Sequence, residues 1–170
     1  MSELNKTLAD IFGYTSFRPG QEEVINHLMK RKKLLAVMPT GAGKSLCFQL
    51  PAILFENQTI VVSPLVALMD DQVINLKDLG VKAERIHSGL SEFQRKQIWE
   101  DFKNKQIKIL YISPESLMRN EMLIALKLWN SFEVSFYSKR NHKGLSAFLR
   151  EFSSFNVIDE DYIHDVEVDM

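Results

Sequence analysis

The sequence has only one cysteine, Cys47, in 170 residues. A single cysteine can form neither an internal disulfide nor a cysteine cluster for zinc, which is typical of a reducing compartment. No run approaches eighteen apolar residues, so we expect no transmembrane helix and no membrane partner. Residues 1–6 lack the charged-then-apolar pattern of a secretory signal. These absences together predict a cytoplasmic protein.

The composition is that of a globular protein, with 45% hydrophobic, 25% charged and 10% aromatic residues. These values exclude wholesale disorder and collagen-like repetition. The length matches one ordinary domain, so two large nucleotide-binding domains are not expected in this chain.

Charge is nearly balanced, with 21 Lys and Arg against 22 Asp and Glu, but it is unevenly distributed. Residues 151–170 contain seven acidic residues and no Lys or Arg. Residues 1–150 therefore hold all 21 basic and only 15 acidic residues, a net charge of +6. A mildly basic body is compatible with a polyanion partner, and equally with ordinary solvated surface charge.

Strand-like and helix-like segments alternate along the chain. We predict strands at 34–38, 59–62, 83–86 and 107–112, and helices at 19–30, 44–55, 65–79 and 116–129. A further helix begins at Ser91, where Gln94 completes a capping box. This order predicts an α/β fold with a mostly parallel sheet, in which ligands bind at the carboxyl ends of the strands.

Residues 38–45 read Met-Pro-Thr-Gly-Ala-Gly-Lys-Ser, between a predicted strand and a predicted helix. Gly41 and Gly43 let the backbone curl so that its N–H groups and the helix N-terminus hold phosphate oxygens. Lys44 is placed to reach the β- and γ-phosphates of ATP, and Ser45 to offer a hydroxyl to Mg²⁺. Met38 stands where the general motif has its first glycine.

The stretch from Thr40 to Ala52 resembles the first motif of RecQ-type DNA helicases, which are built on two RecA-like domains. Upstream, residues 12–21 resemble the adenine-reading motif of that family, which implies that Tyr14, Arg18 and Gln21 contact the base. A tyrosine ring can stack on a purine, and a glutamine amide matches the adenine edge. The nucleotide-binding residues predicted in this way are Tyr14, Arg18, Gln21, Pro39, Thr40, Gly41, Ala42, Gly43, Lys44 and Ser45.

Three further segments resemble RecQ motifs that lie along single-stranded DNA, and each follows a predicted strand. Side chains and helix N-termini at such positions can donate hydrogen bonds to backbone phosphates. The predicted nucleic-acid contacts are Ser63, Pro64, Leu65, His87, Ser88, Ser113 and Pro114. The resemblance covers about residues 4–130.

The resemblance fails where a strand ending in Asp-Glu-Ala-His is expected, because residues 133–142 are basic and polar at the carboxylate positions. In the family, those carboxylates hold the Mg²⁺ shell and activate the attacking water. Residues 155–161 contain an apolar run followed by Asp159 and Glu160. We consider three interpretations: a displaced metal-binding strand, an acidic and partly disordered tail with a short apolar patch, or a chain that leaves the family's reading frame. The tail is favoured by the abrupt change from basic to acidic residues.

The resemblance implies a RecA-like P-loop domain, incomplete at its C-terminal end, over residues 1–130, and a divergent segment with an acidic tail over 131–170. It implies an ATP- and Mg²⁺-dependent 3′–5′ DNA helicase of DNA repair and recombination, associated with the nucleoid in a bacterium or nuclear in a eukaryote. The expected partners are single-stranded or partly duplex DNA and a missing second RecA-like domain, in cis or in trans. We expect ATP and DNA binding with poor turnover by this chain alone. The alternatives are a non-catalytic nucleotide- or DNA-binding module and an RNA helicase of the DEAD-box kind.

Overall fold

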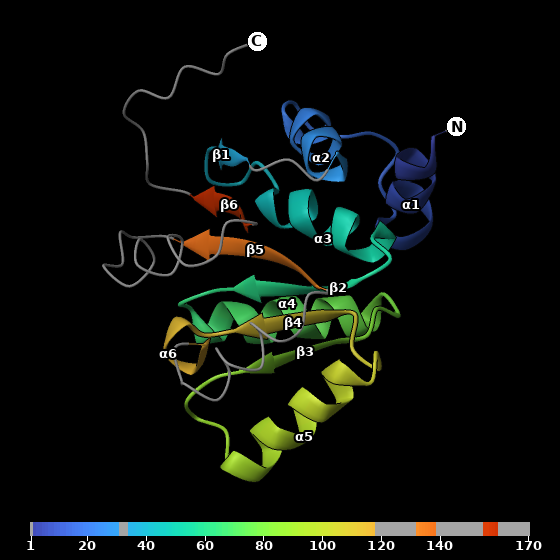
Figure 1. The fold of residues 1–170 in the computed structure, drawn as a ribbon. Coiled ribbons are helices and arrows are strands. Elements are labelled where there is room, and N and C mark those ends of the chain that lie inside the picture. Colours follow the sequence, from blue (N-terminus) through green and yellow to red (C-terminus); the bar gives the residue numbers. More distant parts are fainter. Residues whose placement is uncertain (1, 31–33, 118–131, 139–154, 160–170) are drawn as a thin grey trace.

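The computed structural model describes residues 2–30, 34–117, 132–138 and 155–159. Six strands form one parallel sheet in the order β1-β6-β5-β2-β4-β3 (Figure 1). The strands are β1 (Leu35–Val37), β2 (Gln58–Val62), β3 (Ala83–Ile86), β4 (Ile109–Ile112), β5 (Phe132–Ser138) and β6 (Phe155–Asp159). The predicted α/β fold with a parallel sheet is confirmed, and so are its first four strands.

Helices connect the strands and cover the sheet. They are α1 (Glu3–Phe12), α2 (Gln21–Met29), α3 (Lys44–Leu54), α4 (Val66–Asp78), α5 (Glu92–Lys103) and α6 (Pro114–Leu117). The predicted capping box of α5 is present, because Ser91 Oγ accepts from the backbone N–H of Gln94 while the Gln94 side chain accepts from that of Ser91. Most of the helix predicted at 116–129 lies outside the described residues.

Helix α1 is absent from the sequence-based prediction, although its ends are clearly marked. Ser2 is its N-cap and accepts a hydrogen bond from the backbone N–H of Asn5. Gly13 closes it in the left-handed conformation, with φ of 71°. Leu8 is 1% exposed and packs into the core, so α1 belongs to the domain.

The main core lies between one face of the sheet and helices α1 to α4. Apolar side chains from β2, β3 and β4 meet those of α3 and α4 there, and Phe48 packs edge-on against Tyr111. The opposite face is covered in part by α5, where the backbone carbonyl of Phe102 accepts a hydrogen bond from the Gln58 side chain. Because strands of parallel sheets are covered on both faces, β2 and β4 are buried along their length.

Strands β5 and β6 lie in the segment 131–170, and both belong to the same sheet as β1 to β4. Strand β5 pairs with β2, and β6 lies between β5 and β1. The apolar patch 155–159 is therefore a strand of the sheet. Glu160 and the residues after it lie outside the described part, so the acidic tail stays a prediction. The domain boundary at residue 130 stays a prediction.

Candidate nucleotide-binding site

The loop between β1 and α3 has the backbone that a phosphate-binding loop requires. Gly41 and Gly43 both adopt positive φ, 82° and 77°, which side-chain-bearing residues rarely adopt. Gly43 is the N-cap of α3 and makes no side-chain cap hydrogen bond. The loop amides and the positive end of the helix dipole therefore point toward the place where an anion would bind.

Lys44 is 5% exposed and folds back onto its own loop. Its Nζ donates to the backbone carbonyls of Met38 (2.8 Å) and Pro39 (3.0 Å), at the end of β1. A buried ammonium needs such acceptors, and phosphate oxygens are stronger ones. The lysine is thus held inside the loop, within reach of an arriving phosphate.

Arg18 and Gln21 bind the phosphate loop itself. Arg18 Nη1 donates to the carbonyl of Gly41 (2.5 Å). Gln21, which is 2% exposed, donates through Nε2 to the carbonyls of Ala42 (2.9 Å) and Gly43 (3.0 Å), and its Oε1 accepts from the Arg18 backbone N–H (2.9 Å). Both amide protons of Gln21 are therefore engaged. If the Gln21 NH₂ group is to donate to an adenine edge, one of its bonds to the loop carbonyls must break.

A cleft of about 480 Å³ opens beside the loop, between the segment 12–21 and helices α3 and α4. Tyr14, half exposed, lines it together with Arg18, Gln21, Gly43 and Ser45. The cleft thus joins the residues predicted to contact the base to those predicted to contact phosphate. Pro39, Thr40 and Gly41 are exposed on the loop, and Ala42 is half-buried. The roles of these residues stay predictions.

The residues fit a nucleoside triphosphate with Mg²⁺. The phosphate loop, a buried lysine and the Ser45 hydroxyl form the donor set, and Mg²⁺ in such sites takes most of its ligands from phosphates and water. Within the described ranges, no group of three His, Cys, Asp or Glu could hold a metal alone. Asp159 is paired in register with Val37, the last residue of β1 before the loop.

The predicted nucleic-acid contacts gather at the carboxyl ends of β2, β3 and β4. Ser63 and Ser113 are buried, however: Ser63 Oγ accepts from the Leu65 N–H (3.4 Å), and Ser113 Oγ bonds to Ser116. The exposed members are Leu65 and Ser88, and the half-buried ones are Pro64, His87 and Pro114. A direct phosphate contact from either serine side chain requires the loop to rearrange.

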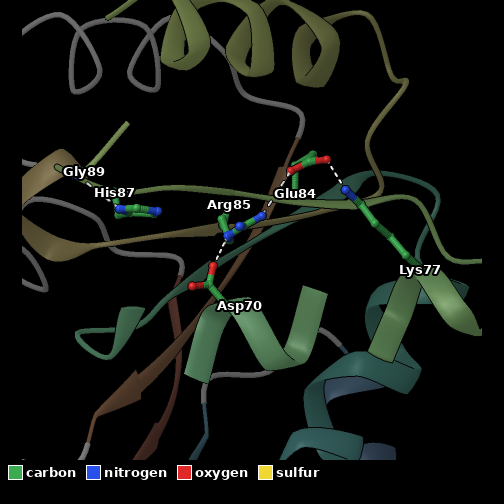
Figure 2. A network of polar contacts seen from close by, with 6 residues as sticks. All are labelled: Asp70, Lys77, Glu84, Arg85, His87 and Gly89. Carbon is green, nitrogen blue, oxygen red and sulfur yellow. Dashed lines mark hydrogen bonds and ion pairs between the residues drawn. The ribbon is translucent and has the colours of Figure 1, made fainter. Parts of the chain in front are cut away.

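A polar network ties α4 to β3 next to this edge (Figure 2). Asp70 and Lys77 of α4 form ion pairs with Arg85 and Glu84 of β3, respectively. Just after β3, His87 Nδ1 accepts from the Gly89 N–H (3.1 Å) and shapes the turn that carries Ser88. Partly exposed pairs of this kind add little stability individually, and the buried Met69, Val73 and Leu76 hold α4 on the sheet.

The sequence-based prediction missed three polar residues near Ser45, namely the half-buried Gln72, which lines the cleft, and the buried Gln49 and Tyr111. Gln72 Nε2 donates to Ser45 Oγ (3.1 Å), and Gln49 Nε2 donates to both Gln72 Oε1 and Tyr111 Oη, the latter at 3.0 Å. A signal was available, since Gln49 interrupts an apolar helix face between Phe48 and Leu50. Cys47 lies nearby, and burial raises its pKa to about 11, so it remains a neutral thiol.

We expect Gly43→Ala to destabilise the protein more than Gly41→Ala. Both substitutions force alanine into positive φ, at a cost of about 1–2 kcal/mol. A Cβ on Gly43 would also lie 2.5 Å from Gln21 Nε2, whereas a Cβ on Gly41 meets no atom within 4 Å. Displacing Gln21 adds about 1–2 kcal/mol for its hydrogen bonds. Urea unfolding measures both losses, and equal losses would show that the Gln21 contact is unimportant.

The family model for the DEAD/DEAH box helicase matches residues 18–164. This range includes the phosphate loop and all described strands.

Curated relatives are RecQ helicases. The "ATP-dependent DNA helicase RecQ" of Synechocystis sp. is 51% identical over 115 residues, which are 68% of this chain and 24% of the relative. The RecQ of Haemophilus influenzae is 43% identical over 78% of this chain and 20% of its own length. The "ATP-dependent DNA helicase Q1" of Mus musculus is 39% identical, with the same two shares. The chain thus spans about a quarter or less of the length of these relatives.

Solved structures agree on the fold. The structure titled "DUF1998 helicase MrfA bound to DNA and AMPPNP" aligns over 97% of this chain and 27% of its own, with a TM-score of 0.73 and 18% identity. Mycobacterium smegmatis helicase Lhr, bound to ssDNA and AMP-PNP, aligns over 94% of this chain and 24% of its own, with a TM-score of 0.68 and 19% identity. The family model covers most of the chain and establishes that the chain belongs to the DEAD/DEAH box helicase family, and the relatives show that it is similar to RecQ-type members.

Proposed function

We propose that this chain forms the nucleotide-binding half of an ATP-dependent DNA helicase motor of RecQ type. The observation that carries the proposal is the phosphate loop: two glycines in positive φ, an uncapped helix N-terminus and the buried Lys44, all beside a cleft that Tyr14 lines. The identity to RecQ helicases supports DNA rather than RNA as the nucleic acid. Such a motor would work in the cytoplasm or the nucleus.

In the proposed complex, Lys44 leaves the carbonyls of Met38 and Pro39 and bonds to the outer phosphate oxygens. The loop N–H groups bind the remaining phosphate oxygens. Gln21 and Arg18 keep the loop open by holding its carbonyls away from the anion. Ser45 would hold Mg²⁺, which neutralises phosphate charge and favours attack by water when it is bound. Tyr14 is placed to stack on the base.

We propose Asp159 as the carboxylate of the metal shell, in place of the missing Asp-Glu-Ala-His strand. The support is its register at the end of β6, next to the last residue of β1. Asp159→Asn removes the charge while conserving the size of the side chain. We expect the rate of ATP hydrolysis to fall at least tenfold and the ATP affinity to change less than about threefold. The reason is that carboxylates of the metal shell contribute mainly to stabilising the charge that develops in the transition state. A stopped assay of phosphate release measures the rate, and an unchanged rate would remove Asp159 from the site.

A second candidate is a nucleotide-binding module without turnover. One feature of the sequence favours it, because residues 133–142 are basic and polar where the carboxylates of the Asp-Glu-Ala-His strand are expected. By its resemblance to RecQ helicases, the ATP site would be completed by an arginine from a second RecA-like domain. We therefore expect slow hydrolysis by this chain alone, and acceleration only when such a domain is supplied.

The test measures binding and turnover on the full chain. We expect binding of a fluorescent ATP analogue that is tighter in Mg²⁺ than in EDTA, and tighter binding of single-stranded DNA than of RNA of the same sequence. Tighter RNA binding would favour the DEAD-box RNA helicase alternative. Nucleotide binding without any hydrolysis, even with a second domain present, would favour the binding module. No nucleotide binding would overturn the proposal.

A further inference from the structure

A chain of hydrogen bonds runs from the phosphate loop into the protein interior. It begins at Ser45 Oγ, which accepts from Gln72 Nε2 of α4 (3.1 Å). Gln72 Oε1 in turn accepts from Gln49 Nε2 of α3, and the same nitrogen donates to the Tyr111 hydroxyl of β4 (3.0 Å). Four side chains from three elements are thus joined, and Gln49 donates both toward the loop, to Gln72, and toward the sheet, to Tyr111.

The inner members of this chain are deeply buried. Gln49 is 7% exposed and Tyr111 is 2% exposed, so an unpaired amide or phenol there would cost stability. Burial raises the pKa of Tyr111, so that the phenol keeps its proton. Gln49 directs both amide protons outward, one to Tyr111 and one to Gln72. The bond from Gln49 fixes the orientation of the Gln72 amide. Because Gln72 Oε1 accepts from Gln49, the NH₂ group of Gln72 faces Ser45.

The arrangement determines what the Ser45 hydroxyl can do. A hydroxyl oxygen has two lone pairs and one proton. One lone pair accepts from Gln72, which leaves the other for a cation and limits rotation about the Cβ–Oγ bond. Groups behind a metal ligand commonly orient it in this way, and their removal typically costs about 10- to 100-fold in metal affinity. Gln72, which bonds to Ser45 Oγ, lies where such an orienting group is expected.

We infer that Gln72, held by Gln49 and Tyr111, is a positioning residue that sets the Ser45 hydroxyl for the divalent cation that accompanies the nucleotide. This inference rests on the proposed function, because it requires a nucleotide and its cation at the phosphate loop. The proposed role of Gln72 differs from nucleotide binding itself. Gln72 bonds to the Ser45 hydroxyl, whereas Gln21 and Lys44 bond to backbone carbonyls of the phosphate loop.

The test replaces the amide while keeping the length of the side chain, in Gln72→Met. Binding of a fluorescent, non-hydrolysable ATP analogue to the full chain is measured across a Mg²⁺ titration and in EDTA. We expect the Mg²⁺ concentration for half-maximal tightening to rise about tenfold, and the affinity in EDTA to change less than about twofold. Gln97→Met is the matched control, because Gln97 lies on the exposed face of α5 and donates to Asp101 there; it should leave both values unchanged.

A second variant tests the inner part of the chain. Tyr111→Phe removes the hydroxyl and keeps the ring that packs on Phe48, so we expect the same direction of change with a smaller size. An unchanged Mg²⁺ midpoint in Gln72→Met would overturn the inference while leaving nucleotide binding intact. An equal loss in EDTA and in Mg²⁺ would also overturn it, since Gln72 would then act on the nucleotide or on the fold. No binding by the wild-type chain would instead overturn the proposed function.

Discussion

Lys44→Ala is expected to weaken ATP binding about ten- to hundredfold. The ammonium would make charge-assisted hydrogen bonds to phosphate, which are worth about 1.5–3 kcal/mol, and 1.4 kcal/mol corresponds to a factor of ten in affinity. In the structure this nitrogen already lies inside the loop, bound to the carbonyls of Met38 and Pro39. Equilibrium binding of a fluorescent ATP analogue to the variant and the wild type gives the ratio.

The matched control is Lys108→Ala. Lys108 also donates through Nζ to two backbone carbonyls, those of Phe55 and Asn57, but it lies just before β4, at the amino end of the strands. The control removes the same type of side chain and the same type of contact, away from the phosphate loop. We expect its ATP affinity to equal that of the wild type. If both variants bind ATP equally weakly, the loss comes from stability rather than from the phosphate contact, and the role of Lys44 is refuted.

Phe48→Ala is expected to destabilise the domain by about 3–5 kcal/mol, the usual cost of removing a buried phenylalanine side chain. Phe48 is 3% exposed and lies on α3, with its ring edge-on to Tyr111 at 6.4 Å between centroids. Because domains are stable by only about 5–15 kcal/mol, this loss removes a large part of the total. Urea unfolding followed by circular dichroism measures it.

Phe93→Ala provides the control for this prediction. Phe93 lies on α5 and is 77% exposed, so its removal should change the free energy of unfolding by no more than about 0.5 kcal/mol. The two variants delete the same atoms from the same residue type in helices of the same domain. A loss below about 1 kcal/mol for Phe48→Ala would mean that the α3–β4 packing adds little to stability.

Features encoded by neighbouring residues were predictable. The phosphate loop depends on glycines, a lysine and a serine within eight positions, and the structure places the glycines between β1 and α3 and the lysine and serine at the start of α3. The capping box at Ser91 and Gln94 is equally local, and both of its hydrogen bonds are present. Helix α1 shows that local signals can be overlooked, since Ser2 and Gly13 are ordinary cap residues.

Two features depend on which distant segments meet, so the sequence by itself left them open. Gln21 was expected at the adenine edge, where its amide chemistry fits, yet its protons bind loop carbonyls more than twenty residues away. Residues 155–159 were considered as a displaced strand, as a patch in an acidic tail or as part of a chain that leaves the family's reading frame, and the abrupt change from basic to acidic residues favoured the tail. Their place between β1 and β5 follows from backbone pairing across the sheet, which is insensitive to the acidic residues that follow.

The sequence by itself determined the fold class, the family resemblance and the phosphate loop, because each depends on residue types at short spacing. Only the tertiary structure decided the strand order, the exposed or buried state of the predicted DNA contacts, and the chain from Ser45 to Tyr111. Gln49 and Tyr111 are 62 residues apart and become partners only because α3 packs on β4. Buried polar side chains need hydrogen-bond partners, and which side chains are buried depends on how the sheet and helices assemble.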